Sequence, residues 1–234
     1  AGLRSIENKE GMPAFIKELP EDAAALLVET RSGCADHLAA QVTEISASIA
    51  ALETVQPVTF TTDPAEYSKF WAIRKGLFPA VGAVRLTGTT VIIEDVAFPV
   101  PQLADAGHDL HQIFAKWHYS EALIFGHALE GNLHFVFTQS FDSQEEIDRY
   151  EGLMDDVANM VVDKYDGSLK AEHGTGRNMA PYVEKEWGPE AYALMWELKE
   201  LFDPHNILNP GVLLNRDPHV HLDNLKPMPA ADAL

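Results

Sequence analysis

The chain has 234 residues and a mass of 25.8 kDa, enough for one large domain or two small ones. Hydrophobic residues make up 46% and charged residues 23%, so intrinsic disorder is excluded as a global description. The 36 acidic and 17 basic residues give a formal net charge of -19, which repels nucleic acids and anionic lipid surfaces. The single cysteine, Cys34, excludes a disulfide framework, an iron–sulfur cluster and a thiolate zinc site, and it fits a reducing compartment.

The ends of the chain indicate its organisation. The start has no apolar region of the kind that a signal peptide needs, and no apolar stretch approaches the roughly 20 residues of a membrane span. Because the chain begins with Ala1 and not with Met, we expect a segment of a longer protein. We expect residues 1–20 to be a leading segment, residues 21–215 to form the domain, and residues 216–234 to be an extended tail.

The first predicted elements are two strands with a helix between them. The apolar run at residues 23–30 predicts a buried strand. Residues 35–51 carry apolar side chains at three- and four-residue steps, which predicts an amphipathic helix. Residues 55–62 predict a second strand. Asp63 and Pro64 then supply the N-cap and first position of a helix that carries Phe70, Trp71 and Arg74.

The rest of the chain alternates strands and helices. Ser143 and Glu146 are spaced like a capping box at the start of the longest helix. Apolar patterning predicts strands at 89–93, 122–125, 133–137 and 168–171, and helices at 102–117, 143–165 and 189–201. Since two strands follow each other closely near residues 122–137, we expect an α+β fold with a largely antiparallel sheet covered by helices.

Two histidines and one glutamate are candidate metal ligands. His127 and His134 bracket a glycine-containing loop between two predicted strands, so both imidazoles can turn toward one point. Neutral imidazole binds Zn, Mn or Fe, and Glu172 offers a carboxylate to complete an open three-ligand site. Spacing alone leaves the alternative that the two histidines are unrelated surface or core residues.

Two arginines are candidate substrate ligands. Arg74 lies beside Trp71 on a predicted helix, where it is either a solvated charge or a bidentate ligand for a substrate carboxylate. Arg85 is isolated in an apolar, glycine-rich passage and is a second candidate. Gly174 and Gly176 flank Thr175, which indicates a tight turn, a close approach of backbone to a ligand, or both.

Three motifs in order carry a resemblance to a known family. They are residues 126–134, residues 172–177, and the stretch 201–211, which reads Leu-Phe-Asp-Pro-His-Asn-Ile-Leu-Asn-Pro-Gly; residues 94–99 match as well. Together they resemble the carboxy-terminal domain of FAD-linked oxidases of the vanillyl-alcohol oxidase type. That group includes D-lactate dehydrogenases, glycolate oxidase subunits and D-2-hydroxyglutarate dehydrogenases. The resemblance implies a ferredoxin-like substrate domain that works with a separate FAD-binding domain.

The resemblance also implies roles for individual residues. His127, His134 and Glu172 match metal ligands, and His173 matches the residue proposed as the catalytic base. Arg74 matches a position that binds the substrate carboxylate, and Arg85 stands in for a substrate-binding lysine of some relatives. Asn209 matches a position that faces the flavin. The family loop reads Gly-His-x-Gly-Asp-Gly-Asn-Leu-His, whereas this chain has Leu129 and Glu130 at the third and fourth positions after the first glycine, so residues around the ligands differ.

The function implied is oxidation of a D-2-hydroxy acid to the 2-oxo acid, with FAD and a divalent metal (Zn, Mn or Fe) as cofactors. The implied partners are the hydroxy acid, an FAD-binding domain of the same polypeptide, and a downstream iron–sulfur domain or another electron acceptor. A homodimer and a cytoplasmic location, with peripheral attachment at the inner membrane, go with this hypothesis. Two alternatives are a non-catalytic interaction or regulatory domain that retains the fold, and a self-contained metal hydrolase.

Overall fold

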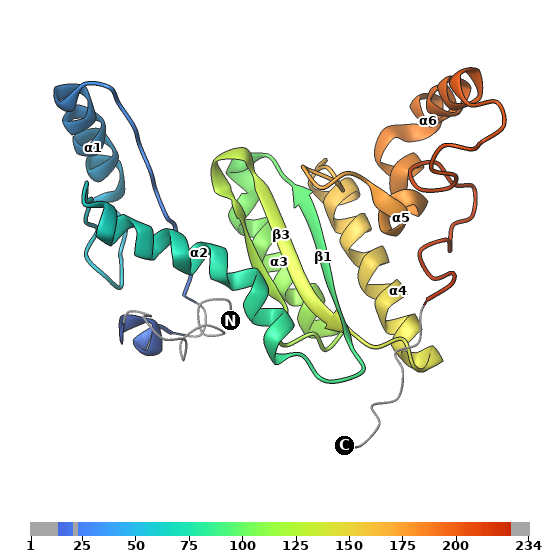
Figure 1. Cartoon of the computed structure of the whole chain (residues 1–234), viewed down its shortest axis with the longest axis horizontal. Helices are drawn as coiled ribbons and strands as arrows, with labels where there is room; N and C mark the ends of the chain where they lie inside the picture. The colour runs from blue at the N-terminus through green and yellow to red at the C-terminus, as the bar shows by residue number, and fades with distance from the viewer. Residues whose placement is uncertain (1–13, 21–22, 226–234) are drawn as a thin grey trace. The chain divides into compact units, whose positions relative to one another are not determined.

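The structure is a computed structural model that describes residues 14–20 and 23–225 (Figure 1). The chain forms two compact units that divide between Ala80 and Val81, and each is described by itself. Among the described residues, no helix is both long and apolar enough to span a membrane. The first 13 residues and the last nine, which include parts of the predicted leading segment and tail, lie outside the described residues.

The first unit consists of helices and irregular segments. It contains the 3₁₀ helix η2 (Ala14–Glu18) and helix α1 (Ala35–Ile49), and helix α2 (Pro64–Val84) begins in it. The predicted helix at 35–51 is confirmed, and its apolar stripe is half-buried. Asp63 caps α2 as predicted, because its Oδ1 accepts a hydrogen bond of 2.9 Å from the backbone N–H of Ala65.

The two strands predicted in this unit are wrong. Residues 23–30 and 55–62 adopt no regular secondary structure, and Leu26 is 76% exposed. A strand is stable only with a hydrogen-bonded neighbour. The sheet formed by the described residues contains neither segment. Although both segments are apolar, neither has a hydrogen-bonded neighbouring strand in this sheet.

The second unit is built on a three-stranded antiparallel sheet. Its strands are β1 (Thr90–Ala97), β2 (Leu123–His127) and β3 (Asn132–Gln139), in the order β1-β3-β2. The predicted strands at 89–93, 122–125 and 133–137 are therefore confirmed, and the α+β class with an antiparallel sheet is correct. The register places Asp95 of β1 directly opposite His134 of β3. The ferredoxin-like topology stays a prediction.

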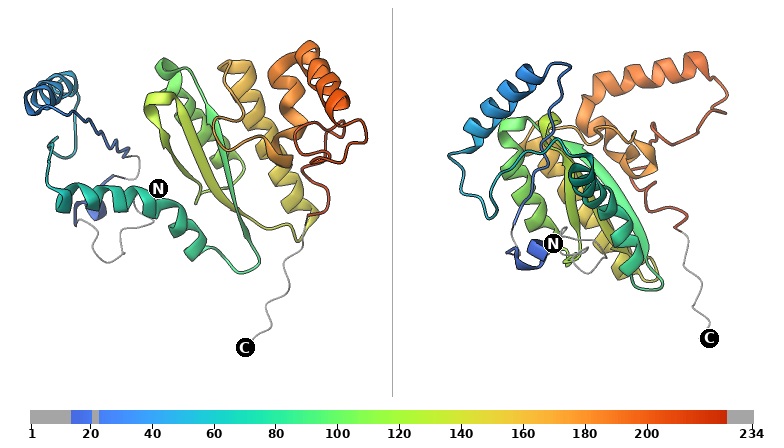
Figure 2. Two further views of the ribbon diagram at one scale, coloured as in Figure 1. Left: turned by 45° about the horizontal axis from the view of Figure 1, so that its top comes forward. Right: turned by 60° about the vertical axis from the view of Figure 1, so that its left-hand side comes forward.

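Two helices cover one face of this sheet. Figures 1 and 2 show α3 (Leu103–Lys116) and α4 (Gln144–Asn159) on the same side of the strands. The 3₁₀ turn η3 (Val100–Gln102) precedes α3, and the π-helical turn η5 (Met160–Lys164) extends α4. Ser143 caps α4 by accepting from the backbone N–H of Glu146. The main core lies between sheet and helices and includes Val96, Leu110, Phe114, Phe135, Phe137, Tyr150, Leu153 and Val157.

The last part of the unit is helical and then irregular. It contains α5 (Gly176–Met179), η6 (Ala180–Tyr182) and α6 (Val183–Phe202), which is interrupted at Gly188, where φ is 78°. The helix predicted at 189–201 is confirmed, whereas the strand predicted at 168–171 is only an isolated bridge between Ala97 and Ser168. Residues 218–224, in the predicted extended tail, form turns that bury Val220 and His221.

Candidate functional site

A tight connection between β2 and β3 holds the two histidines of the predicted metal site. His127 ends β2, the 3₁₀ turn η4 (Ala128–Glu130) follows, and His134 lies in β3. A Cβ on Gly126 would lie 2.1 Å from the carbonyl oxygen of Asn132, so only glycine allows the strands to approach this closely. The close approach of the two strands at this connection therefore depends on the backbone contact between Gly126 and Asn132.

Glu172 brings its carboxylate to both imidazoles. Its Oε1 lies 3.0 Å from Nε2 of His134 and 3.4 Å from Nε2 of His127. His134 exposes only 4% of its side chain, whereas His127 and Glu172 each expose 53%. The structure thus brings together three residues that lie up to 45 positions apart in the sequence.

These three side chains fit a metal ion. Ligand atoms at about 2.1 Å from a tetrahedral zinc are separated by roughly 3.4 Å from each other. The observed separations of 3.0 and 3.4 Å between Glu172 and the histidines match this spacing. The donors are the two nitrogens and one oxygen that Zn, Mn and Fe accept, and two of the three residues are exposed, which leaves room for a further ligand. That the cluster binds a metal stays a prediction.

A buried aspartate positions the segment that carries Glu172. Asp95 is fully buried in β1, and its Oδ2 accepts hydrogen bonds from the backbone N–H groups of Glu172 (2.6 Å) and His173 (3.3 Å). Glu186 of α6 fixes the start of the same segment, since its carboxylate accepts from Ser168 Oγ at 2.7 Å and from the backbone N–H of Leu169. The segment is anchored from two sides.

His173, the predicted base, stacks on one of the candidate ligands. The rings of His173 and His134 have centroids 4.7 Å apart and an interplanar angle of 11°. His173 exposes 35% of its side chain, and its Nδ1 lies 3.6 Å from Oδ1 of Asp95. Burial, and next the neighbouring His173, lower the pKa of His134, which favours the neutral imidazole that a metal requires.

Four polar residues at this site were not identified as functional from the sequence. Glu94 and Asp95 lie buried in β1, Lys170 makes an ion pair with Glu94, and Asn178 donates to Glu94 at 2.8 Å. The available signal was a pair of adjacent acidic residues, Glu94 and Asp95, within an otherwise apolar stretch. Burial of two carboxylates is costly unless other groups compensate their charge, so such a pair indicates a built polar network.

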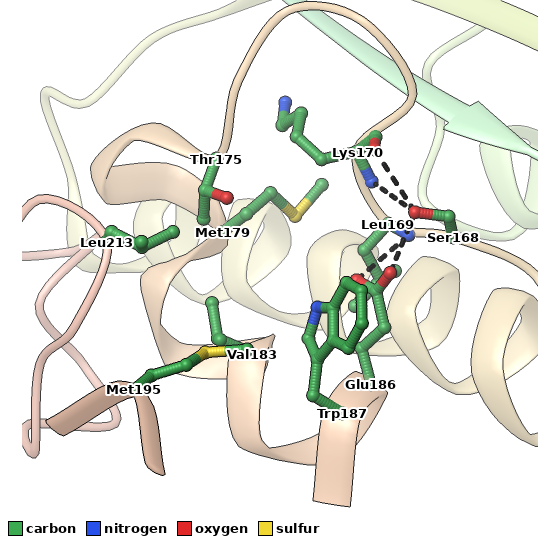
Figure 3. Close-up of a pocket in the computed structure, with 10 residues that line it drawn as sticks. All are labelled: Ser168, Leu169, Lys170, Thr175, Met179, Val183, Glu186, Trp187, Met195 and Leu213. Atoms are coloured by element: carbon green, nitrogen blue, oxygen red, sulfur yellow. Dashed lines mark hydrogen bonds between the residues drawn. The ribbon is translucent and has the colours of Figure 1, made fainter. Parts of the chain in front are cut away.

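A pocket of about 220 Å³ lies beside the anchored segment (Figure 3). Lys170 and Thr175, which flank Glu172 and His173 in the chain, line it together with apolar side chains of Met179, Val183 and Met195. The pocket's lining does not include the three candidate ligands, so it is a neighbour of the cluster and not its cavity.

The remaining sequence candidates lie on other elements. Arg74 is a half-buried residue of α2 in the first unit, and Arg85 is exposed in the segment between α2 and β1. Asn209 is an exposed loop residue with φ of 43°, and its carbonyl accepts from the backbone N–H of Val212. Their roles toward substrate and flavin stay predictions.

The third sequence motif has a structural role of its own. Asp203 ends α6, and its carboxylate accepts from the backbone N–H groups of Ile207 (2.9 Å) and Leu208 (2.8 Å) and from Lys199. The Lys199 hydrogen bond, followed by the two backbone hydrogen bonds, lowers the pKa of Asp203 to about 2. This part of the motif organises a turn.

Comparisons with known proteins agree with these motifs. The family model of FAD linked oxidases, C-terminal domain, matches residues 2–213. The glycolate oxidase subunit GlcD of Bacillus subtilis is 30% identical over 199 residues, which covers 85% of this chain and 41% of that protein. A D-lactate dehydrogenase of Anaerostipes hadrus is 28% identical over 86% of this chain and 42% of its own length. The mitochondrial D-2-hydroxyglutarate dehydrogenase of Arabidopsis thaliana is 32% identical over 69% of this chain and 27% of its own length.

The chain thus spans less than half the length of these curated relatives. The family model, in contrast, covers nearly all of the chain, including both histidines of the hairpin, the Glu172 segment and Asp203. The chain belongs to the family of C-terminal domains of FAD linked oxidases.

Proposed function

We propose that this chain is the substrate-binding domain of an FAD-dependent dehydrogenase that oxidises a D-2-hydroxy acid, of the D-lactate or D-2-hydroxyglutarate class, to the 2-oxo acid. The observation that carries the proposal is the convergence of His127, His134 and Glu172 with His173 stacked beside them. The relatives named above, which are oxidases and dehydrogenases of hydroxy acids, support the substrate class.

In this proposal His127, His134 and Glu172 hold a divalent metal, which polarises the substrate hydroxyl when bound. His173 accepts the hydroxyl proton, because its ring lies beside the cluster and is partly open to solvent. FAD, if bound by its own domain, would supply the acceptor for the hydride of the substrate Cα, so that this hydride and the hydroxyl proton taken up by His173 would together account for the two hydrogens lost. Arg74 and Arg85 are proposed to bind substrate carboxylates.

The test uses the flavoprotein that combines this chain with its FAD-binding domain. Anaerobic flavin reduction by D-lactate, D-2-hydroxyglutarate and their L-enantiomers identifies the substrate, and metal analysis of the purified protein counts the ion. We expect Glu172→Gln and His134→Ala to lose the metal and at least about 100-fold in reduction rate, with FAD still bound.

Glu197→Gln is the matched control, because Glu197 is an exposed residue of α6 outside the cluster. Its metal content and reduction rate are expected to equal those of the unaltered protein. Unchanged metal content and turnover in Glu172→Gln would refute the roles assigned to the cluster. His173→Asn separates base from ligand, since it is expected to keep the metal and lose flavin reduction.

A further inference from the structure

Two buried polar atoms on neighbouring strands have no hydrogen-bond partner in the described part of the chain. They are Nδ1 of His134 and Oδ1 of Asp95, and both residues are at least 97% buried. The register of β1 and β3 places these two residues directly opposite each other. Polar atoms of Asp95, His134 and His173 lie within 4.8 Å of one another. A buried donor or acceptor that is left unpaired is destabilising, and a pairing between these two atoms would satisfy both.

The second nitrogen of His134 is already assigned by geometry. Its Nε2 lies 3.0 Å from Glu172 Oε1, at the position where the candidate ligands converge. A ligating imidazole must present a lone pair at that nitrogen, so its proton must reside on Nδ1. Histidine ligands usually donate this second N–H to a carboxylate or carbonyl, and Asp95 is the buried carboxylate directly opposite His134 in the strand register.

We propose that Asp95 is the positioning residue of this site, an inference that rests on the proposed function. Its Oδ2 fixes the backbone of Glu172 and His173 through two hydrogen bonds. Its Oδ1 accepts the Nδ1–H of His134 and thereby holds Nε2 free for the metal. One side chain thus sets the place of one ligand, the orientation of a second and the position of the predicted base.

Lys170 makes this arrangement compatible with burial. Its ammonium group pairs with Glu94 and lies 3.6 Å from Oδ1 of Asp95. A single buried carboxylate without a counter-charge is strongly unfavourable. The ammonium group also occupies the space beside Asp95 with a positive charge, which disfavours a second cation between Asp95, His134 and His173.

The isosteric variant Asp95→Asn gives a sharp expectation. Asn offers one oxygen, which the backbone N–H groups of Glu172 and His173 occupy, and its NH₂ group then faces Nδ1 of His134. Nδ1 becomes an acceptor and the proton moves to Nε2. The variant should therefore reverse the tautomer of His134, whereas a merely structural role of Asp95 would leave the tautomer unchanged.

The measurement is a long-range ¹H–¹⁵N correlation spectrum of the metal-free, ¹⁵N-histidine-labelled Glu172→Ala chain at about pH 8, where histidines are neutral. The Glu172→Ala background is needed because, without a metal, the carboxylate 3.0 Å from Nε2 of His134 would itself accept a hydrogen bond from Nε2–H. The signal of His134 is the one that disappears in His134→Ala. We expect Nδ1–H in the Glu172→Ala chain and Nε2–H when Asp95→Asn is added to it. Asp105→Asn, which changes an exposed aspartate of α3, is the control and should leave the tautomer as it is.

A second readout is zinc affinity, for which we expect a loss of about 10–100-fold in Asp95→Asn and none in Asp105→Asn. An Nε2–H tautomer in the Glu172→Ala chain would overturn the proposal even if the chain that also carries Asp95→Asn did not fold. So would an unchanged tautomer in folded Asp95→Asn. If the unaltered chain binds no zinc, the metal site of the proposed function is refuted. The tautomer of His134 still tests whether Asp95 accepts a hydrogen bond from its Nδ1–H.

Discussion

The backbone of Gly131 lies directly against the backbone of Phe98. A Cβ on Gly131 would stand 2.0 Å from the carbonyl oxygen of Phe98, and the carbonyl of Gly131 accepts a hydrogen bond of 2.9 Å from the N–H of Phe98. Gly131 also has a positive φ of 66°. The turn between His127 and His134 is therefore docked on the end of β1, and it needs glycine for two separate reasons.

Gly131→Ala tests both reasons. The left-handed conformation costs a non-glycine residue about 1–2 kcal/mol. Displacement of the Phe98 backbone adds about 1–3 kcal/mol, as other overpacked sites do. Urea unfolding of the chain measures the sum. Gly176→Ala is the matched control, because Gly176 has φ of 65° and no atom within 4 Å of its added Cβ, so only the first cost applies. Equal losses in the two variants would contradict the steric contact.

Two phenylalanines should differ widely in their contribution to stability. Phe135 is fully buried in the main core, whereas Phe202 at the end of α6 is 79% exposed. We expect Phe135→Ala to cost about 3–5 kcal/mol of unfolding free energy. We expect Phe202→Ala to stay within about 0.5 kcal/mol, as exposed substitutions usually do. Chemical denaturation of both variants checks the core, and a large loss in Phe202→Ala would show that this residue is covered in solution.

The stability of the chain should fall in mild acid. Burial lowers the pKa of His221, which lies against Tyr182 and Tyr150. The unfolded chain then binds a proton below about pH 6.5 that the folded chain does not, so unfolding free energy decreases as pH falls through that range. The contribution of one such group is at most about 1.4 kcal/mol per pH unit.

His221→Phe should reduce this slope between about pH 6.5 and 5, measured by urea unfolding at a series of pH values. The slope should not vanish, because burial lowers the pKa of His134 in the same direction. The exposed His205 serves as control, and His205→Gln should keep the full slope. A slope that is identical with and without His221 would contradict the burial of its neutral form.

Asp203 should hold the turn after α6. Asp203→Ala removes the acceptor for the N–H groups of Ile207 and Leu208, so amide exchange of both should accelerate markedly, with far-UV circular dichroism unchanged. The amide of Asp203 itself donates to the carbonyl of Lys199 and provides the internal reference. Protected amides at 207 and 208 in the variant would show that other contacts hold the turn.

Local patterns predicted most elements of the second unit. The periodicity of α4, the capping by Ser143 and the strands around His134 depend on neighbours within the same segment, which the sequence displays directly. The predictions of strands at 23–30 and 55–62 were wrong for the opposite reason. Strand formation depends on a partner elsewhere in the chain, and apolar composition at one segment carries no information about that partner.

The site was predictable in part for similar reasons. His127 and His134 lie on one hairpin, so their approach follows from the strand assignment. The part played by Asp95 depends on two contacts with the backbone of residues 172 and 173. Every residue except proline has a backbone N–H donor, so the residue types at positions 172 and 173 do not indicate the hydrogen bonds to Asp95.

The contacts from Asp95 to the backbone of residues 172 and 173 join positions that are 77 and 78 residues apart. Closing so long a loop is entropically costly, and such pairings generally form late during folding. The hairpin with both histidines closes over a few residues and needs no such step. We therefore expect the two imidazoles of the hairpin to come together during folding before the segment that carries Glu172 docks beside them.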